Sequence, residues 1–171
     1  MRSLVATFVG IGLVFAQVSP HEKTEATIAG KKITIEYGRP YVKGRKIFGE
    51  GTLVPYGKVW RIGADQRTKL TIDGDMMIGS LHVVKGSYSL WAIPGEKSWT
   101  LLVNKAADGW GAQWDYDSKI KATEYGRTEM TVSPAPPTEQ LTIAVTGKSG
   151  PEGKLTITWE KTQASVDLYV H

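Results

Sequence analysis

Short runs of alternating polar and apolar residues, broken repeatedly by glycine and proline, constrain this chain more than any other feature. Thr, Val, Ile and Trp dominate these runs, and turn pairs such as Asp73-Gly74 and Pro94-Gly95 separate them. A period of two is typical of strands that bury one face. The expected strands fall within residues 24–38, 69–84, 86–93, 98–104, 127–133, 140–147, 154–162 and 164–170.

This spacing predicts an all-β fold, because short strands with turn residues roughly every 8–12 residues are typical of sandwiches and barrels. We expect a single antiparallel β-sandwich, jelly-roll-like or similar, with one long glycine-rich basic loop region. The chain has 171 residues, which suits one domain with a sizeable core. The proline-rich stretch 133–139 is interpreted as a connection between sheets or a stiff loop.

The first residues differ from the rest of the chain. Arg2 is followed by an apolar run over 4–16, and small residues near Ala16 suit cleavage. These are the three parts of a secretory signal. The run is shorter than the about 20 apolar residues that a membrane-spanning helix needs. We therefore expect a signal peptide over 1–16, one mature domain over 17–171 with no membrane span, and a secreted or periplasmic location.

Composition argues against several kinds of site. The chain has no cysteine, which excludes disulfides and thiolate metal sites. Its histidines, His21, His82 and His171, have no ligand-like spacing, so no metal site is expected. No nucleotide-binding motif is complete, and no cofactor is expected. The net charge of +4 on its own would be compatible with binding nucleic acid. The expected secretion signal argues against this partner, so nucleic acid is not expected.

One segment, residues 38–69, breaks the strand pattern and concentrates the charge. Eight basic residues against two acidic ones give it a net charge of +6, and it contains six glycines. A loop of this length inside a compact domain is unusual, and such loops are often functional. We interpret the segment as a site for an anionic group. The alternative is a solvated basic loop whose arginine stems cover aromatic residues.

Five residues of this segment are the candidates for ligand binding: Lys43, Arg45, Trp60, Arg61 and Asp65. Arg45 and Arg61 can each hold a carboxylate or phosphate at two points, and Lys43 adds charge. Trp60 is either a stacking platform for a sugar or base or, given the usual burial of Trp, a core anchor. Arginines near Asp65 would lower its pKa, which suits an ion pair better than a general base.

Outside the segment, four residues have expected structural or chemical roles. Tyr88 is expected to face the core with its hydroxyl hydrogen-bonded, and Asn104 is expected to fix a loop. Asp115 and Asp117 alternate along a possible strand, which would place both on one side. Paired carboxylates can do acid–base chemistry, but we interpret these two first as surface charges.

Several motifs occur together in a fixed order: GRKIFG, LVPYGKVWRIGA, GSYSLWAIPG, and WTLLVNK with WG a few residues on. In this combination the chain resembles the domain-of-unknown-function family 2911 over nearly all of its mature length, from about Ser19 to the late strands. The resemblance implies a secreted bacterial protein with no established activity and no known catalytic residue. The family often has Asn after GA, where this chain has Asp65. A site that needs an amide donor at this position would have a carboxylate there instead.

Three functions remain open from the sequence. The first is a non-catalytic extracytoplasmic module that binds an anionic small molecule, an acidic glycan or an envelope protein. The second is a hydrolase-like or isomerase-like enzyme in which Arg61 stabilises an anionic transition state and Asp65 or Asp115 does acid–base work. The third is a structural domain in which segment 38–69 covers one end of the sandwich and its arginines pair with carboxylates.

Overall fold

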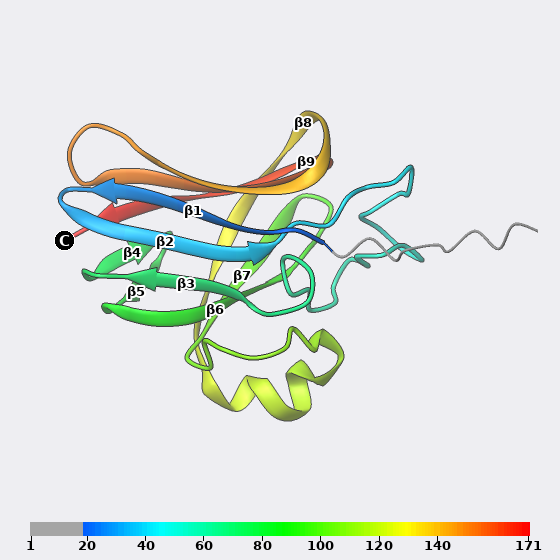
Figure 1. Ribbon diagram of the computed structural model, residues 1–171, viewed down its shortest axis with the longest axis horizontal. Coiled ribbons are helices and arrows are strands. Elements are labelled where there is room, and N and C mark those ends of the chain that lie inside the picture. Colours follow the sequence, from blue (N-terminus) through cyan, green and yellow to red (C-terminus); the bar gives the residue numbers. More distant parts are fainter. Residues whose placement is uncertain (1–18) are drawn as a thin grey trace, which may run out of the picture.

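The computed structural model describes residues 19–171 and shows nine strands in one antiparallel sheet (Figure 1). The predicted signal segment 1–16 lies outside the described residues. The strands are β1 (His21–Ile28), β2 (Lys31–Gly38), β3 (Thr68–Ile72), β4 (Met76–Ile78), β5 (Leu81–Val83), β6 (Gly86–Ile93), β7 (Ser98–Asn104), β8 (Glu124–Gly147) and β9 (Glu152–Val170). The prediction of an all-β antiparallel fold is confirmed.

The two layers are parts of one sheet, with the order β1-β2-β3-β6-β7-β8-β9-β4-β5, that curls over itself without closing into a barrel. β8 passes from one layer to the other. Its first part pairs with β7, and its later part lies beside β1 and β2. Figure 1 shows β8 and β9 arching across one side of the molecule.

The bend in β8 falls at its prolines. The register with β9 shifts between Pro134 and Thr138 and again before Thr142. Proline has no backbone N–H and cannot continue a ladder, so the strand changes direction there. The stretch 133–139, expected to connect sheets or form a stiff loop, is thus a bend inside one strand. β9 bends at Glu160, the partner of Thr138, and joins the two runs expected as separate strands.

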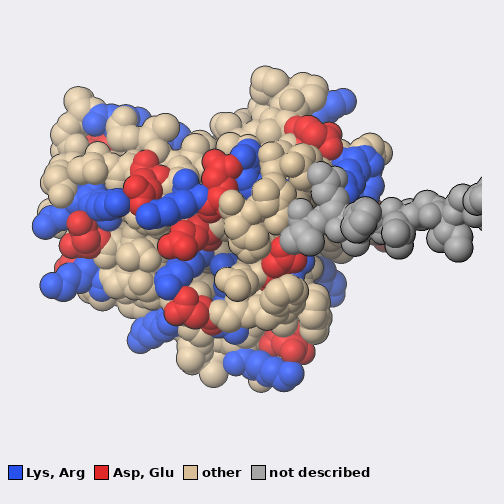
Figure 2. Space-filling model, viewed as in Figure 1, with Lys and Arg blue, Asp and Glu red and all other residues tan. Residues whose placement is uncertain are grey.

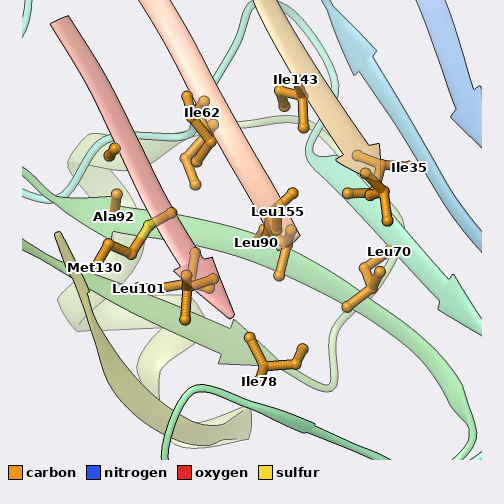
Figure 3. Packing of buried hydrophobic residues seen from close by; sticks show 14 of the residues in the cluster. Ile35, Ile62, Leu70, Ile78, Leu90, Ala92, Leu101, Met130, Ile143 and Leu155 are labelled. Atoms are coloured by element: carbon orange, nitrogen blue, oxygen red, sulfur yellow. The ribbon is translucent and has the colours of Figure 1, made fainter. Parts of the chain in front are cut away.

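The core fills the space between the two layers (Figure 3). Alternating side chains of β2, β3, β4, β6, β7, β8 and β9 meet there, among them Ile35, Leu70, Ile78, Leu90, Leu101, Met130, Ile143 and Leu155. Burying an apolar side chain of this size stabilises a fold by about 1.5–3 kcal/mol. Tyr88 also faces inward, and its hydroxyl donates to the Val84 carbonyl at 2.8 Å, which confirms the expectation for this residue.

Segment 38–69 caps one end of this core. Its apolar side chains Ile47, Phe48, Val54, Trp60 and Ile62 are buried in the main cluster. In Figure 1 the segment forms the irregular loops beyond the ends of β1 and β2, and Figure 3 shows Ile62 among the side chains of the strands. The segment is therefore part of the packed structure, as in the third function considered above.

Three short helical turns follow β7: η1 (Gln113–Asp115), η2 (Tyr116–Ile120) and η3 (Lys121–Thr123). We refer to residues 113–123 as the helical segment. Within residues 19–171, no helix has both the length and the hydropathy needed to cross a membrane.

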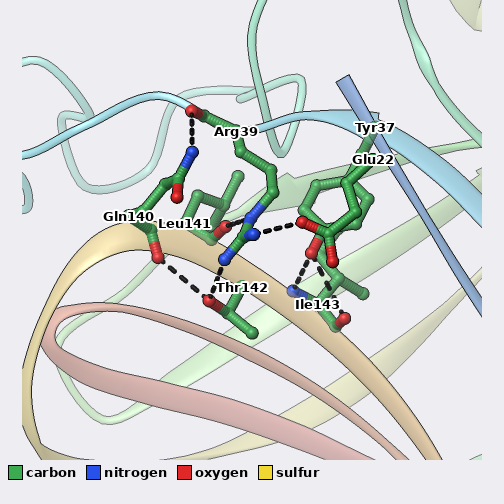
Figure 4. A network of polar contacts seen from close by, with 7 residues as sticks. All are labelled: Glu22, Tyr37, Arg39, Gln140, Leu141, Thr142 and Ile143. Atoms are coloured by element: carbon green, nitrogen blue, oxygen red, sulfur yellow. Dashed lines mark hydrogen bonds and ion pairs between the residues drawn. The ribbon is translucent and has the colours of Figure 1, made fainter. Parts of the chain in front are cut away.

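The seam between β2 and the later part of β8 is joined by Arg39 rather than by a regular ladder (Figure 4). Arg39 donates from Nε to the Leu141 carbonyl at 2.8 Å and from Nη2 to Thr142 Oγ1 at 2.9 Å. Its third nitrogen forms an ion pair with Glu22 of β1. One side chain thereby ties both layers together.

Tyr37 makes the second connection across the seam. Its hydroxyl accepts the Ile143 backbone N–H at 2.9 Å and donates to the Ile143 carbonyl at 3.4 Å, although the residue is only 2% exposed. Without this hydroxyl, both backbone groups of Ile143 would lose a partner, and a buried polar group without a partner is costly.

We expect Tyr37→Phe to lower the free energy of unfolding by about 1–3 kcal/mol, the usual cost of leaving a buried backbone donor unpaired. Denaturant unfolding measures the change. Tyr169→Phe is the matched control, because Tyr169 is 46% exposed and should change stability by less than about 0.5 kcal/mol. Equal effects of the two substitutions would show that the seam does not depend on the Tyr37 hydroxyl.

Candidate functional site

Three of the five predicted ligand residues line one hollow in the cap. Arg45, Trp60 and Arg61 border a cavity of about 200 Å³, which we call the two-arginine pocket. Its other lining residues are Pro40, Leu53, Gly63, Ala64, Gln113 and Trp159. No Asp or Glu occurs among them. The pocket thus combines two guanidinium groups with no carboxylate.

Arg61 is held in the pocket by backbone carbonyls. Its Nε donates to Gly63 at 3.2 Å, and its Nη1 donates to Asp65 and Gly111, both at 3.3 Å. Burial lowers the pKa of Arg61 below its ordinary value, and the charge of Asp65 partly offsets this. Carbonyl groups orient the guanidinium but do not neutralise it. Among the described residues, Nη2 has no hydrogen-bond partner.

Arg45 is anchored in a similar way but is more exposed. Its Nε donates to the Val42 carbonyl at 3.0 Å and its Nη2 to the Tyr41 carbonyl at 2.7 Å. Within residues 19–171, no carboxylate lies within ion-pair distance of Arg45 or Arg61. Each arginine is therefore fixed by carbonyls and keeps one terminal nitrogen available.

Aromatic rings form the inner wall of the pocket. Trp60 and Trp159 stack with centroids 6.0 Å apart and an angle of 10°, and Phe48 meets both rings edge-on. Trp60 is only 4% exposed, so it is a core anchor and offers no open face to a sugar. The indole N–H of Trp159 is buried and has no hydrogen-bond partner, and the same holds for Trp99 of this cluster. Buried donors are normally satisfied, so Trp159 leaves one unsatisfied donor beside the pocket.

Lys43 and Asp65 do not line the pocket. Lys43 has φ 50° and Asp65 has φ 64°, a region that Asn and Asp tolerate better than most residues. The Asp65 carboxylate instead lies 3.4 Å from His21 Nε2. An Asp or Asn after Gly-Ala is therefore explained by the backbone turn. That Lys43 and Asp65 bind a ligand stays a prediction.

Gly111 allows the loop after β7 to approach Arg61 closely. A Cβ at this position would lie 2.6 Å from Arg61 Cδ and 3.0 Å from the Asp65 carbonyl oxygen. The Gly111 N–H also donates to that carbonyl at 2.8 Å. This explains the glycine of the Trp-Gly pair in the sequence motif, because any larger residue at position 111 would displace Arg61.

The helical segment contributes Gln113, whose Oε1 accepts the Arg61 backbone N–H at 3.2 Å. Asn104 holds this segment in place: its Nδ2 donates to the Ile120 carbonyl at 2.9 Å, and its Oδ1 accepts bonds from Ala106 and Thr123. The predicted loop-fixing role of Asn104 is confirmed.

Asp115 and Asp117 lie in this helical segment and not on a strand, which corrects the expected alternation. Asp115 pairs with Lys119 at 2.8 Å and Asp117 pairs with Lys121 at 3.4 Å. Both pairs have the i,i+4 spacing that brings side chains together on a helix. They are surface charges, and neither aspartate lines the two-arginine pocket.

The helical segment packs on the sheet through Tyr116 and Ile120, which meet Trp91 and Leu102. The Tyr116 hydroxyl donates to Glu124 Oε2 at 2.9 Å, and Arg127 donates to the same carboxylate at 2.5 and 3.0 Å. Burial raises the pKa of Tyr116 far above its ordinary value. Burial opposes ionisation of Glu124 as well, yet its hydrogen bonds outweigh this and lower the pKa of the carboxyl.

A hollow of about 560 Å³ lies on the outer face of β1, β2 and β3. Several of its charges are compensated: Lys69 pairs with Asp108 at 2.7 Å, and Glu36 stands between Lys23 and Lys69 in the strand register. Arg67, which also lines it, donates to the carbonyls of Ala106, Asp108 and Trp110. Figure 2 shows both signs of charge intermixed on this face. Within residues 19–171, no three His, Cys, Asp or Glu side chains converge to hold a metal ion.

Comparison with known proteins identifies a family match over the whole folded region. A family model described as Protein of unknown function (DUF2911) matches residues 19–168, in agreement with the resemblance found from the motifs. No curated protein and no solved structure matches the chain. The function is therefore inferred from the geometry of the pocket.

The Glu124 network predicts a specific pH dependence of stability. The pKa of Glu124 is lowered in the folded protein, so its contribution is complete above the unfolded pKa of about 4.3 and is lost as the pH falls through the folded value. We expect Glu124→Gln to lower the free energy of unfolding by about 1–2 kcal/mol at neutral pH. The difference from the original protein should shrink toward zero in acid.

Denaturant unfolding from pH 7 down to pH values near 3 tests this expectation. Glu129→Gln is the matched control, because Glu129 lies on the same strand and is exposed. A difference for Glu124→Gln that is as large in acid as at neutral pH would contradict a role for its charge.

Proposed function

We propose a binding function for this chain, which belongs to the family described as Protein of unknown function (DUF2911). The protein is a non-catalytic extracytoplasmic module that holds an anionic group in the two-arginine pocket. The group belongs to a small molecule, an acidic glycan or an envelope protein. One observation carries the proposal: Arg45 and Arg61 border the same hollow, and no carboxylate lines it.

Pre-organisation of the two guanidinium groups supports this proposal. Each is fixed through two of its nitrogens on backbone carbonyls, so little side-chain freedom is lost when an anion binds. Charge-assisted hydrogen bonds to a carboxylate or phosphate are among the strongest polar contacts in proteins. Burial already disfavours the charge on Arg61, so a bound anion would relieve a cost that the free protein bears.

The lining of the pocket favours binding over acid–base catalysis. Asp65 points its carboxylate toward His21, and Asp115 pairs with Lys119. Neither carboxylate considered for proton transfer lines the pocket. A hollow of about 200 Å³ is also smaller than the roughly 300–1,000 Å³ of a typical small-molecule site, so it suits one anionic group of a larger ligand.

The extracytoplasmic part of the proposal rests on the sequence. Arg2, the apolar run over 4–16 and the small residues near Ala16 have the pattern of a secretory signal. The lack of cysteine is compatible with an oxidising compartment, since no free thiol is exposed there.

A thermal-shift experiment with glucuronate, citrate and inorganic phosphate tests the proposal on the purified protein. A probe at a hundred times its dissociation constant adds about 2.7 kcal/mol, which raises the melting temperature by roughly 5–10 °C for a domain of this size. We expect at least one probe to give this shift, and high salt to reduce it. Arg45→Gln and Arg61→Lys should each remove most of the shift.

Lys46→Ala is the matched control for Arg45→Gln. It removes the same single charge from the same segment, but Lys46 does not line the pocket. The melting temperature of each variant without a probe separates lost binding from lost folding. If no probe shifts the original protein, or if Arg45→Gln keeps the full shift, the pocket is not an anion site.

A further inference from the structure

A second hollow adjoins the two-arginine pocket. It measures about 320 Å³ and includes Lys58, Trp114 and Asp117 in its lining, and we call it the Trp114 pocket. The two pockets share Trp60 and Gln113 as lining residues, so a common wall separates them. The linings of the two pockets are therefore contiguous through Trp60 and Gln113.

Trp114 is unusually exposed for its size. Its exposed fraction is 72%, the largest among the large apolar side chains of residues 19–171. The residue does not sit on a loose loop: it lies in η1, and η2, which follows η1, buries Tyr116 and Ile120 against the sheet. Asn104 bonds to the end of η2. The fold thus holds an indole ring in water next to a charged pocket, although burying the ring would stabilise the protein.

The chemistry around Trp114 matches a sugar ring. A pyranose has a face of C–H groups, which packs on an aromatic ring, and a rim of hydroxyl groups, which needs hydrogen-bond partners. Lys58, Gln113 and Asp117 supply donors and acceptors around Trp114. The charges of Lys58 and Asp117 are opposite, so this pocket offers a cation to a sugar carboxylate as well as hydrogen-bond partners to neutral hydroxyl groups.

The pocket walls are less suited to a peptide. Recognition by strand addition needs an open strand edge, but Trp60 and Ala92 exchange both of their backbone hydrogen bonds, at 2.7 and 2.9 Å. Recognition of a helix needs a continuous apolar groove. Here a charged pocket and a polar-rimmed aromatic pocket lie side by side instead.

We propose that the two pockets together bind an acidic oligosaccharide. The carboxylate of one uronic-acid unit lies between Arg45 and Arg61, and the adjoining sugar ring stacks on Trp114. This inference rests on the proposed function, because it assigns a ligand class to the same anion site. The stacking role then belongs to Trp114, which has an open face, and not to the buried Trp60.

Calorimetric titration of the purified protein with glucuronate and with a galacturonate trimer tests the inference. In the original protein we expect the trimer to bind about tenfold more tightly than the single sugar, the size of one aromatic contact. Trp114→Ala should remove this advantage and leave glucuronate binding unchanged. Trp114→Phe should restore part of it.

Trp110→Ala is the matched control, because Trp110 is 57% exposed but lines neither pocket. It should keep the tenfold difference. A neutral glucose trimer should bind far more weakly than the galacturonate trimer, since it lacks the carboxylate.

The outcomes separate the two proposals. If glucuronate binds but the trimer binds no better, or if Trp114→Ala keeps the advantage, the oligosaccharide inference is wrong and the anion site stands. If a tri-glutamate peptide binds more tightly than the galacturonate trimer, the ligand is an acidic peptide and not a glycan. If neither sugar binds, the oligosaccharide inference is wrong, and the thermal shift with citrate and inorganic phosphate decides whether the anion site stands.

Discussion

The closure of the curled sheet depends on the contacts that Arg39 and Tyr37 make across one seam. A sheet that folds over itself without forming a barrel leaves two strands facing each other with no regular ladder between them. Arg39 bonds to the Leu141 carbonyl, to Thr142 and to Glu22, and Tyr37 satisfies both backbone groups of Ile143. These side chains replace the missing ladder.

The seam also sets the position of the cap, because Arg39 lies at the start of segment 38–69. Two backbone bonds continue the seam into the cap, one from Leu141 to the Pro40 carbonyl and one from Val42 to the Glu139 carbonyl. Arg45 is anchored on the same turn, through the carbonyls of Tyr41 and Val42. The two-arginine pocket is therefore built on the same contacts that hold the two layers of the sheet together.

The sequence predicts the strands well because each strand buries one face and alternates accordingly. The runs 86–93 and 98–104 coincide with β6 and β7. It does not predict the path of β8, because the prolines of 133–139 indicate that a ladder breaks but not that the same strand continues beyond the break. The helical segment is missed for a related reason: its stability comes from packing on Trp91 and from Asn104, not from a long apolar stripe.

For the candidate site, charge and glycine content point to the segment from which Arg45 and Arg61 line one pocket. Gln113 and Trp159 have no such signal, since they reach the pocket from distant parts of the sequence. Asp65 has a conformational reason for its residue type. Its backbone has φ 64°, and the sequence alone does not separate such a requirement from a chemical one.

The energetic cost of the partly buried charge on Arg61 favours a role of the pocket in ligand binding. An arginine needed only for the fold is best placed beside a carboxylate or in water, since burying a charge without a counter-charge is costly. Arg39 and Arg127 follow this rule, with Glu22 and Glu124 as partners. Arg61 and Arg67 do not: both are partly buried and donate to neutral backbone carbonyls. Of the two, Arg61 lines the two-arginine pocket; burial lowers its pKa, and the nearby Asp65 carboxylate, 3.4 Å from His21, offsets this only in part. A fold that keeps such a charge only partly compensated gives up stability, and natural proteins typically do so where function requires it.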